Sequence, residues 1–242
     1  MLQKLSSTAR AVMAILVWTF IAFDTLVVFI AIALCKPFDP MGKFTHRIAN
    51  FWGKSIIQSN PFWQVTFTGQ DHIRNDKAYV LVANHASLAD IVCLYCLGKN
   101  FKWIAKANLF DIPFFGWTMS LLDYIPLRRG EHGSIRSTFQ EAQKWLQKGV
   151  SVLFFPEGTR SRTGELGEFK NGAFKLAALT GTPIIPIVIR GTGKAISKGK
   201  ATMAPRIQGS IRVLKPVDVA SHPPEDYGAL KKKVRDLMSE AL

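Results

Sequence analysis

Asn84 and His85 follow a short apolar run, Val80–Ala83, and Asp90 comes five residues after His85. Histidine titrates near neutral pH and is the usual general base. A carboxylate that accepts from one ring nitrogen leaves the other nitrogen free to take a proton. The alternative is a histidine that caps a helix or lies in a polar loop. The sequence contains no G-x-S-x-G and no cysteine beside His85, so we expect the nucleophile to belong to the substrate.

Residues 157–160, Glu-Gly-Thr-Arg, form a second polar cluster after the apolar run 149–155. An arginine fork and backbone N–H groups suit phosphate recognition, although a surface ion pair would use the same residues. Residues 160–215 contain eleven Lys or Arg against two acids, and Arg128 and Arg129 add a second cationic point. These clusters predict a site for an anionic substrate.

The composition narrows the choice of anion. The chain has 242 residues, of which 48% are hydrophobic, and a net charge of +14. This charge predicts nucleic acid, phosphate esters or an acidic lipid surface as partner. Because the sequence contains no helix-turn-helix, RNP or zinc-finger pattern, we expect no nucleic acid. Three cysteines do not make a disulfide framework, and Cys93 and Cys96 lie in an apolar stretch typical of buried thiols.

Strands that alternate with helices must position these clusters, which indicates an α/β fold. Both clusters follow predicted strands, and the carboxyl ends of strands line the site in such folds. We expect a mixed sheet flanked by helices in residues 61–242, after an N-terminal helical module in residues 1–60. The predicted strands are 62–68, 78–83, 149–155, 183–189 and 210–214, and the predicted helices are 88–97, 134–148, 173–179 and 227–242.

The N-terminal module has the composition of a membrane anchor. Residues 11–34 carry one charge, Asp24, and would extend about 36 Å as a helix, longer than the apolar part of a signal peptide. Asp24 is costly in lipid, so it faces a protein neighbour or the helix lies shallow. Residues 44–57 follow as a basic amphipathic helix, which suits a membrane interface or packing on the globular part. Its apolar stripe is Phe44, Ile48, Phe51, Trp52 and Ile56.

Two further segments, 101–103 and 110–117, are dense in aromatic residues. They fit either the protein core or an exposed rim that enters the headgroup layer of a membrane. The sequence leaves both possibilities open.

In combination, four short blocks resemble the glycerolipid acyltransferases, and among them the bacterial enzymes that acylate 1-acylglycerol 3-phosphate. They occur in the family's order over about residues 80–190. The blocks are NHASLAD at 84–90, YIPLRR at 124–129, FPEGTR at 155–160 and PIIPIVI at 183–189. One departure is Asp123, which occupies a place where the family's second block commonly has glycine, and Arg128 occupies a variable place.

The resemblance implies acyl transfer from acyl-CoA or acyl carrier protein to lysophosphatidic acid, giving phosphatidic acid. His85 would deprotonate the acceptor's glycerol hydroxyl and Asp90 would orient His85, with no acyl-enzyme, metal or cofactor. The enzyme would act with membrane lipids, at the cytoplasmic face of a bacterial inner membrane. The implied contacts to the glycerol phosphate are Arg129, Glu157, Gly158, Thr159 and Arg160, with Lys106 as a further candidate.

Three alternatives remain open on the sequence. The same chemistry could act on glycerol 3-phosphate, another lysophospholipid or a lyso-ornithine lipid. A metal-dependent phosphoesterase would use His85, Asp90 and Glu157 as ligands. A non-catalytic protein could bind anionic lipid and consume no thioester.

Overall fold

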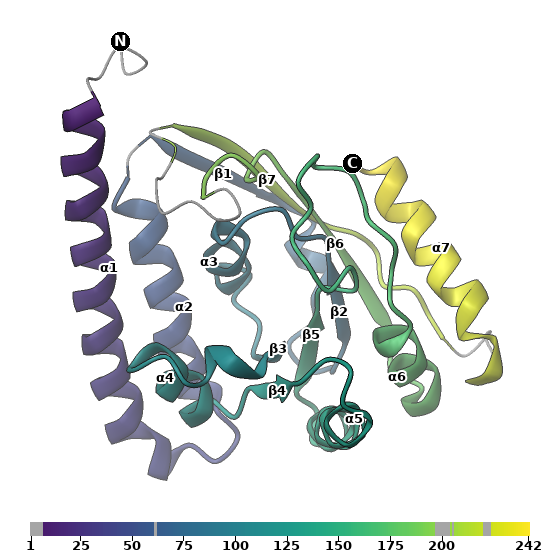
Figure 1. The fold of residues 1–242 in the computed structure, drawn as a ribbon. Coiled ribbons are helices and arrows are strands. Elements are labelled where there is room, and N and C mark those ends of the chain that lie inside the picture. Colours follow the sequence, from purple (N-terminus) through teal and green to yellow (C-terminus); the bar gives the residue numbers. More distant parts are fainter. Residues whose placement is uncertain (1–6, 61, 197–203, 205, 220–223) are drawn as a thin grey trace.

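The computed structural model describes residues 7–60, 62–196, 204, 206–219 and 224–242, and has one seven-stranded sheet (Figure 1). The strand order is β1-β7-β6-β2-β5-β3-β4, and only β6 and β7 pair antiparallel. The predicted α/β class with a mixed sheet is thereby confirmed. The strands are β1 Trp63–Thr68, β2 Val80–Ala83, β3 Phe101–Lys106, β4 Ile125–Leu127, β5 Ser151–Phe154, β6 Ile184–Arg190 and β7 Ile207–Val213.

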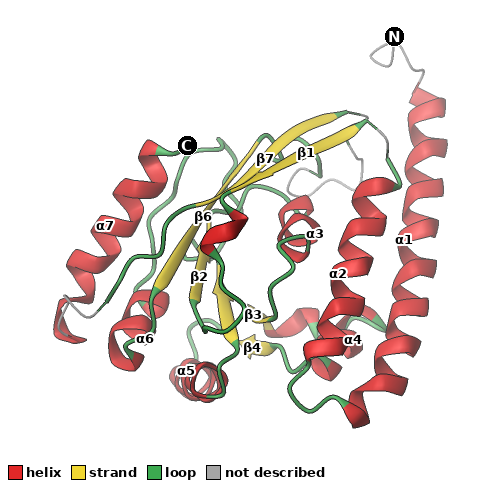
Figure 2. Ribbon diagram, turned by 180° about the vertical axis from the view of Figure 1, so that it is seen from behind, coloured by secondary structure: helices red, strands yellow, loops and turns green. Residues whose placement is uncertain are grey.

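Helices cover both faces of the sheet (Figure 2). In β2, Leu81 packs in the cluster that contains α1 to α4, whereas Val82 packs in the cluster that contains α5 to α7. A strand covered on both faces is apolar at every position, which explains the run at β2. The helices are α1 Ser7–Cys35, α2 Lys43–Gln58, α3 Ala89–Tyr95, α4 Phe115–Leu121, α5 His132–Gln147, α6 Gly172–Thr180 and α7 Tyr227–Glu240.

All five predicted strands and all four predicted helices of the globular part are present, with ends that differ by no more than three residues. Three elements were not predicted: β3, α4 and β4. The pattern of β3 is irregular because Lys102, its second residue, is buried together with Phe101 and Trp103 on either side. The Lys102 ammonium donates to the Leu122 carbonyl at 2.7 Å and lies 4.2 Å from the centre of the Trp145 ring. These contacts compensate a buried charge that sequence patterns do not anticipate.

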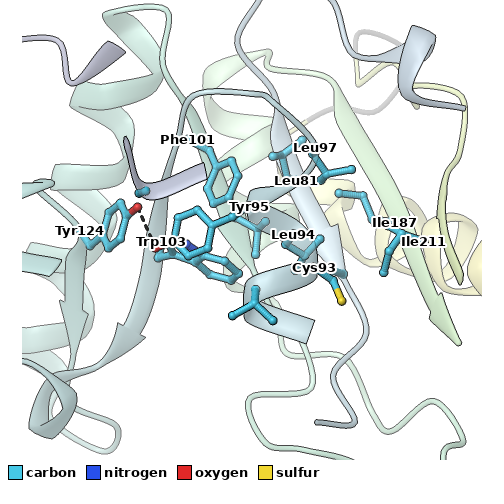
Figure 3. Packing of buried hydrophobic residues seen from close by; sticks show 14 of the residues in the cluster. Leu81, Cys93, Leu94, Tyr95, Leu97, Phe101, Trp103, Tyr124, Ile187 and Ile211 are labelled. Carbon is cyan, nitrogen blue, oxygen red and sulfur yellow. Dashed lines mark hydrogen bonds between the residues drawn. The ribbon is translucent and has the colours of Figure 1, made fainter. Parts of the chain in front are cut away.

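The two aromatic segments have different environments. Phe101 and Trp103 are buried in the core beside Tyr95 (Figure 3). By contrast, Phe114 and Trp117 are 41% and 47% exposed. Segment 101–103 is therefore core, and segment 110–117 presents an apolar rim on the surface.

Asp24 faces a protein neighbour, one of its two predicted placements. The Ser55 hydroxyl of α2 donates to the Asp24 carboxylate. One turn away, the Trp52 indole N–H donates to the Thr25 hydroxyl at 3.1 Å. These bonds turn the polar positions of α1 towards α2 and leave most of the apolar surface of α1 exposed.

The apolar stripe predicted for α2 does not share one environment. Trp52 and Ile56 are buried against the protein, whereas Phe44 and Phe51 are 53% and 65% exposed. The buried face of the helix is centred on residues such as His46 and Gly53. Trp52 lies at one border of this face, next to the two exposed phenylalanines. One part of the predicted stripe therefore packs on the globular part, and the other part is exposed on the surface.

Residues on both sides of position 60 contribute to one core. Val28 and Ile32 of α1 and Trp52 of α2 pack in the same cluster as Leu81 and Ile185 of the central strands. The proposed division of the chain into residues 1–60 and 61–242 stays a prediction.

Candidate active site

The two polar clusters lie side by side because the strands before them are neighbours. β2 pairs in parallel with β5, with Val80 opposite Val152 and Val82 opposite Phe154. The strands end at the same edge of the sheet, so the turn after each strand projects from that edge. This places His85 next to the segment that begins at Phe155.

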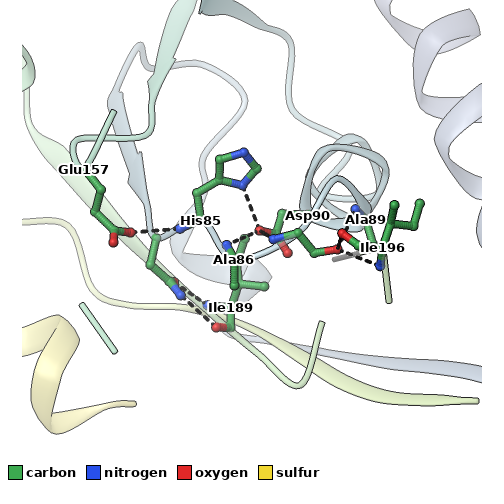
Figure 4. Close-up of polar contacts among 9 residues, drawn as sticks. His85, Ala86, Ala89, Asp90, Glu157, Ile189 and Ile196 are labelled. Carbon is green, nitrogen blue, oxygen red and sulfur yellow. Dashed lines mark hydrogen bonds and ion pairs between the residues drawn. The ribbon is translucent and has the colours of Figure 1, made fainter. Parts of the chain in front are cut away.

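His85 and Asp90 form the pair expected from their spacing (Figure 4). The distance from His85 Nδ1 to Asp90 Oδ2 is 2.8 Å. The same carboxylate oxygen accepts from the backbone N–H of Ala86 at 2.7 Å and of Ser87 at 2.8 Å. With its proton on Nδ1, the imidazole leaves Nε2 as an acceptor, which is the arrangement of a general base.

A stacking contact also holds one face of the imidazole ring. Its ring stacks on that of Phe155, with centroids 3.9 Å apart and planes inclined by 11°. The His85 side chain keeps 13% of its surface exposed, whereas the Asp90 side chain keeps none. A substrate can therefore reach the ring but not the carboxylate.

Two side chains for which sequence reasoning gave no role hold the turn that carries His85. The Asn84 side chain donates to the Ile189 carbonyl at 2.9 Å and accepts from the Ile189 N–H at 2.7 Å. The Ser87 hydroxyl bonds to both backbone groups of Ile196, each at 3.2 Å. Both side chains are buried. Polar residues directly after an apolar strand were the only sequence signal for this role. The signal could not identify their partners, which lie about a hundred residues away in the sequence.

Glu157 is placed differently from the other predicted phosphate contacts. The residue is 8% exposed, and its carboxylate accepts from the backbone N–H groups of His85 at 3.0 Å and Gly167 at 2.9 Å. Both carboxylate oxygens are thus occupied within the protein. A carboxylate also repels a phosphate, whereas it is a natural acceptor for buried N–H groups.

Three cations line a pocket at the carboxyl ends of β3 and β4. In the parallel pair of β3 and β4, Lys106 lies opposite Leu127, so Arg128 and Arg129 follow next to it. The three cations line a cavity of about 370 Å³ that contains one acid, Asp111. Arg128, identified from the sequence only as part of a second cationic point in a variable place, lines the same pocket as Lys106 and Arg129.

Arg129 connects this pocket to the second cluster. A Cβ atom built on Gly158 would lie 3.7 Å from the guanidinium carbon of Arg129. Gly158 has φ of +68°, in the left-handed region that glycine adopts without strain. Thr159 and Arg160 follow in the same turn, with Thr159 exposed and Arg160 half-buried. The predicted contacts therefore lie close together around the edge of the sheet.

Asp123, the departure from the family's second block, keeps the backbone that glycine would adopt. Its φ of +54° lies in the left-handed region. The side chain contacts the ammonium of Lys36 and lies 3.5 Å from that of Lys102. These ion pairs offset the local strain of the left-handed backbone at Asp123.

Comparisons with known proteins identify the family of this chain. Residues 64–190 match the acyltransferase family. The chain is 42% identical over 179 residues to the chloroplast 1-acyl-sn-glycerol-3-phosphate acyltransferase of Arabidopsis thaliana, covering 73% of this chain and 49% of the relative. It is 34% identical over 185 residues to the Saccharomyces cerevisiae 1-acyl-sn-glycerol-3-phosphate acyltransferase, covering 74% of this chain and 59% of that one. The chain thus spans about half the length of the curated relatives it matches most strongly.

A solved structure extends the likeness over the whole fold. The 1-acyl-sn-glycerophosphate acyltransferase of Thermotoga maritima superposes with a TM-score of 0.80 at 27% sequence identity. The superposition covers 96% of this chain and 95% of that one. Sequence, fold and site geometry therefore agree that the chain belongs to the acyltransferase family.

Proposed function

We propose that this protein transfers an acyl group from a thioester to the free glycerol hydroxyl of lysophosphatidic acid, giving phosphatidic acid. The observation that carries this proposal is the His85–Asp90 pair beside a cationic pocket. The relatives named as 1-acyl-sn-glycerol-3-phosphate acyltransferases support the choice of acceptor.

In this reaction, Nε2 of His85 takes the proton of the acceptor hydroxyl while Nδ1–H remains bonded to Asp90. The acceptor oxygen attacks the thioester carbonyl, and collapse of the tetrahedral intermediate breaks the carbon–sulfur bond. The departing thiolate takes the proton from His85, which restores the base. Asp90 stabilises the positive charge that the imidazole carries in between.

No acyl-enzyme is included in the proposal. The Ser87 hydroxyl is fully buried and bonded to Ile196, so it is not free to attack a thioester. Burial raises the pKa of the Cys93 thiol, which keeps it from ionising near neutral pH. These features support direct attack by the acceptor.

The pocket supports a phosphate monoester as the acceptor's head group. Lys106, Arg128 and Arg129 carry three positive charges against the single negative charge of Asp111. The net charge of +2 complements the roughly −2 charge of a phosphate monoester near neutral pH. Arg160, with Gly158 and Thr159, would complete the contacts from the neighbouring turn.

The exposed apolar surface supports membrane association. α1 is long and apolar enough to cross a membrane by length and composition. The Phe29 ring of α1 lies 5.7 Å from that of Phe114 and 5.9 Å from that of Trp117, which joins the apolar rim before and within α4 to α1. We place the enzyme at the cytoplasmic face of a bacterial inner membrane, where its lipid partners lie, although the Arabidopsis relative is named chloroplastic.

The donor would be acyl-CoA or acyl carrier protein, both anionic, with no metal or cofactor and no nucleic-acid partner. Among the residues that the structure describes, no three His, Cys, Asp or Glu side chains are placed to share a metal ion. The ligand set of the phosphoesterase alternative is therefore not assembled by His85, Asp90 and Glu157.

The test is a thioester assay on purified protein in lipid–detergent micelles. Lysophosphatidic acid and acyl thioester should give phosphatidic acid and free thiol in equal amounts, with the same rate in chelator. His85→Ala should lower kcat by about 10²–10⁴-fold, the usual contribution of a general base. A near wild-type rate in His85→Ala would exclude the proposed base.

A panel of acceptors and donors separates the alternatives. Higher kcat/KM on glycerol 3-phosphate, another lysophospholipid or a lyso-ornithine lipid would move the function to that acceptor. Comparing acyl-CoA with acyl carrier protein identifies the donor. Phosphate release that chelator stops would indicate a phosphoesterase, and vesicle binding without thiol release would indicate a lipid-binding protein.

A further inference from the structure

The main chain of His85 is held from both sides by one short segment. Its N–H donates to the Glu157 carboxylate at 3.0 Å, and its carbonyl accepts from the Ser161 N–H at 2.7 Å (Figure 4 shows the first contact). The imidazole itself is held by other residues, Asp90 and Phe155. Backbone and ring of the base are therefore restrained separately.

Glu157 is anchored at its second oxygen as well. Oε2 accepts from the Gly167 N–H at 2.9 Å, so the carboxylate bridges the catalytic turn and a loop ten residues further along the chain. The residue is 8% exposed, and a buried polar group is costly unless it is hydrogen-bonded, as both oxygens of Glu157 are. The carboxylate is thus part of the support of His85 and has no free oxygen directed at an anionic ligand.

We propose that Glu157 is a positioning residue for His85, and that residues 157–161 couple acceptor binding at Arg160 to the placement of the base. Arg160 lies between Glu157 and Ser161, the two residues that hold the His85 main chain. When Arg160 engages the acceptor phosphate, it restrains the segment that sets the height of the imidazole over the substrate hydroxyl. This coupling rests on the proposed function, whereas the support of His85 by Glu157 does not.

Gly167 offers a way to disturb Glu157 from outside the site. A Cβ atom at Gly167 would lie 3.0 Å from Glu157 Oε2, closer than ordinary van der Waals contact. Gly167 does not have positive φ, so alanine is compatible with its backbone. Gly167→Ala should therefore displace the carboxylate without removing any group that contacts substrate.

Gly172→Ala is the matched control. Gly172 begins α6, and its added Cβ would meet only the Phe154 ring at 4.0 Å. We expect Gly167→Ala to lower kcat about tenfold with less than a twofold change in the KM for lysophosphatidic acid, and Gly172→Ala to stay within twofold in both. Glu157→Gln, which keeps one acceptor oxygen but cannot accept both N–H groups, should lower kcat further. A raised KM with unchanged kcat in Glu157→Gln, or wild-type kinetics in Gly167→Ala, would overturn the proposal.

A second measurement does not depend on the acceptor. The rate at which diethyl pyrocarbonate modifies His85 can be followed by peptide mass spectrometry, with His72 and His132 as internal references. Gly167→Ala should change the rate at His85 several-fold relative to the references, and Gly172→Ala should not. If wild-type protein fails to acylate lysophosphatidic acid but this change is seen, the proposed function fails and the positioning role of Glu157 stands. An unchanged rate at His85 overturns the positioning role.

Discussion

Asp90 uses a single carboxylate oxygen for the whole catalytic turn. Oδ2 accepts from His85 Nδ1 and from the N–H groups of Ala86 and Ser87, whereas the buried Oδ1 has no hydrogen-bond partner among the described residues. The two N–H groups determine how the side-chain amide would be oriented in an Asp90→Asn variant. An amide NH₂ turned towards them would place donor against donor, so the amide oxygen must occupy the Oδ2 position. Geometry and tautomer would then survive while the charge is lost.

Asp90→Asn therefore tests whether the charge of Asp90 matters beyond fixing the tautomer of His85. We expect kcat to fall by about 10²-fold or more, since the imidazolium formed during the reaction loses its counter-charge. The measurement is the pH dependence of kcat/KM, with Asp90→Ala as the variant that loses both functions. Equal rates in wild type and Asp90→Asn would restrict Asp90 to orienting the ring.

Arg128 gives a second prediction at the scale of single residues. It lines the cationic pocket but is exposed, so its attraction to a phosphate bound there would be partly screened by water. We expect Arg128→Ala to raise the acceptor KM about fivefold, equivalent to roughly 1 kcal/mol, with little change in kcat. Arg136→Ala, an exposed arginine of α5, is the control. Equal KM values in the two variants would remove Arg128 from the acceptor site.

At the scale of elements, α2 packs on the sheet through a buried histidine. His46 lies edge-on to Phe101 at 4.7 Å, and its Nδ1 is 3.4 Å from the Tyr124 hydroxyl, which bonds to Tyr95 at 2.9 Å. Burial lowers the pKa of His46 from 6.5 to about 3, and the nearby Lys102 acts in the same direction. The helix is therefore docked with a neutral imidazole.

The shift at His46 predicts an acid-sensitive attachment of α2. Between pH 6.5 and pH 3 the unfolded chain binds the proton and the folded protein does not, so lowering the pH through this window favours unfolding. Each pKa unit is worth about 1.4 kcal/mol. In His46→Gln, which does not titrate, the free energy of unfolding should fall less from pH 7 to pH 4. Parallel pH dependences in wild type and variant would contradict the shift.

At the scale of the whole molecule, exposed apolar side chains concentrate on one side. Leu16, Phe23 and Leu34 of α1 are 65%, 65% and 69% exposed, and Phe38 after α1 is 88% exposed. α1 lies beside α2 and α4, whereas α6 and α7 lie across the sheet (Figure 1). An exposed surface of this kind on a structured protein marks a membrane or protein contact.

The apolar face of α1 should therefore control binding to lipid. We expect the double variant Leu16→Gln, Phe23→Gln to sediment less with vesicles that contain an anionic lipid. The control is Ile135→Gln, Leu179→Gln, which alters exposed residues of α5 and α6. Circular dichroism would check that both variants remain folded. Equal sedimentation of the two variants would move the membrane contact away from α1.

Local patterns were enough to predict five of the seven strands, most of the helices that cover them and the pairing of His85 with Asp90. Apolar runs, turn residues and a spacing of five residues each involve residues that are near one another in the sequence. They can therefore be recognised without knowledge of the fold. The aromatic-rich strand β3 was not predicted because Lys102 is buried against partners distant in sequence. The strand β4 was not predicted because it has only three residues, Ile125–Leu127, and the middle one is a proline.

Only the tertiary structure decided which groups line the cationic pocket and which support the turn that carries His85. Glu157 and Arg160 are close in sequence, yet the carboxylate of Glu157 turns inward to His85 and Gly167. Asn84 finds its partner at Ile189, and Arg128 meets Lys106 through the pairing of β3 with β4. These contacts join segments that are distant along the chain, so their energies depend on how the sheet brings strand ends together. The sequence therefore determined which reactive side chains are available at this site. The sheet determined which of them line the pocket and which support the turn that carries His85.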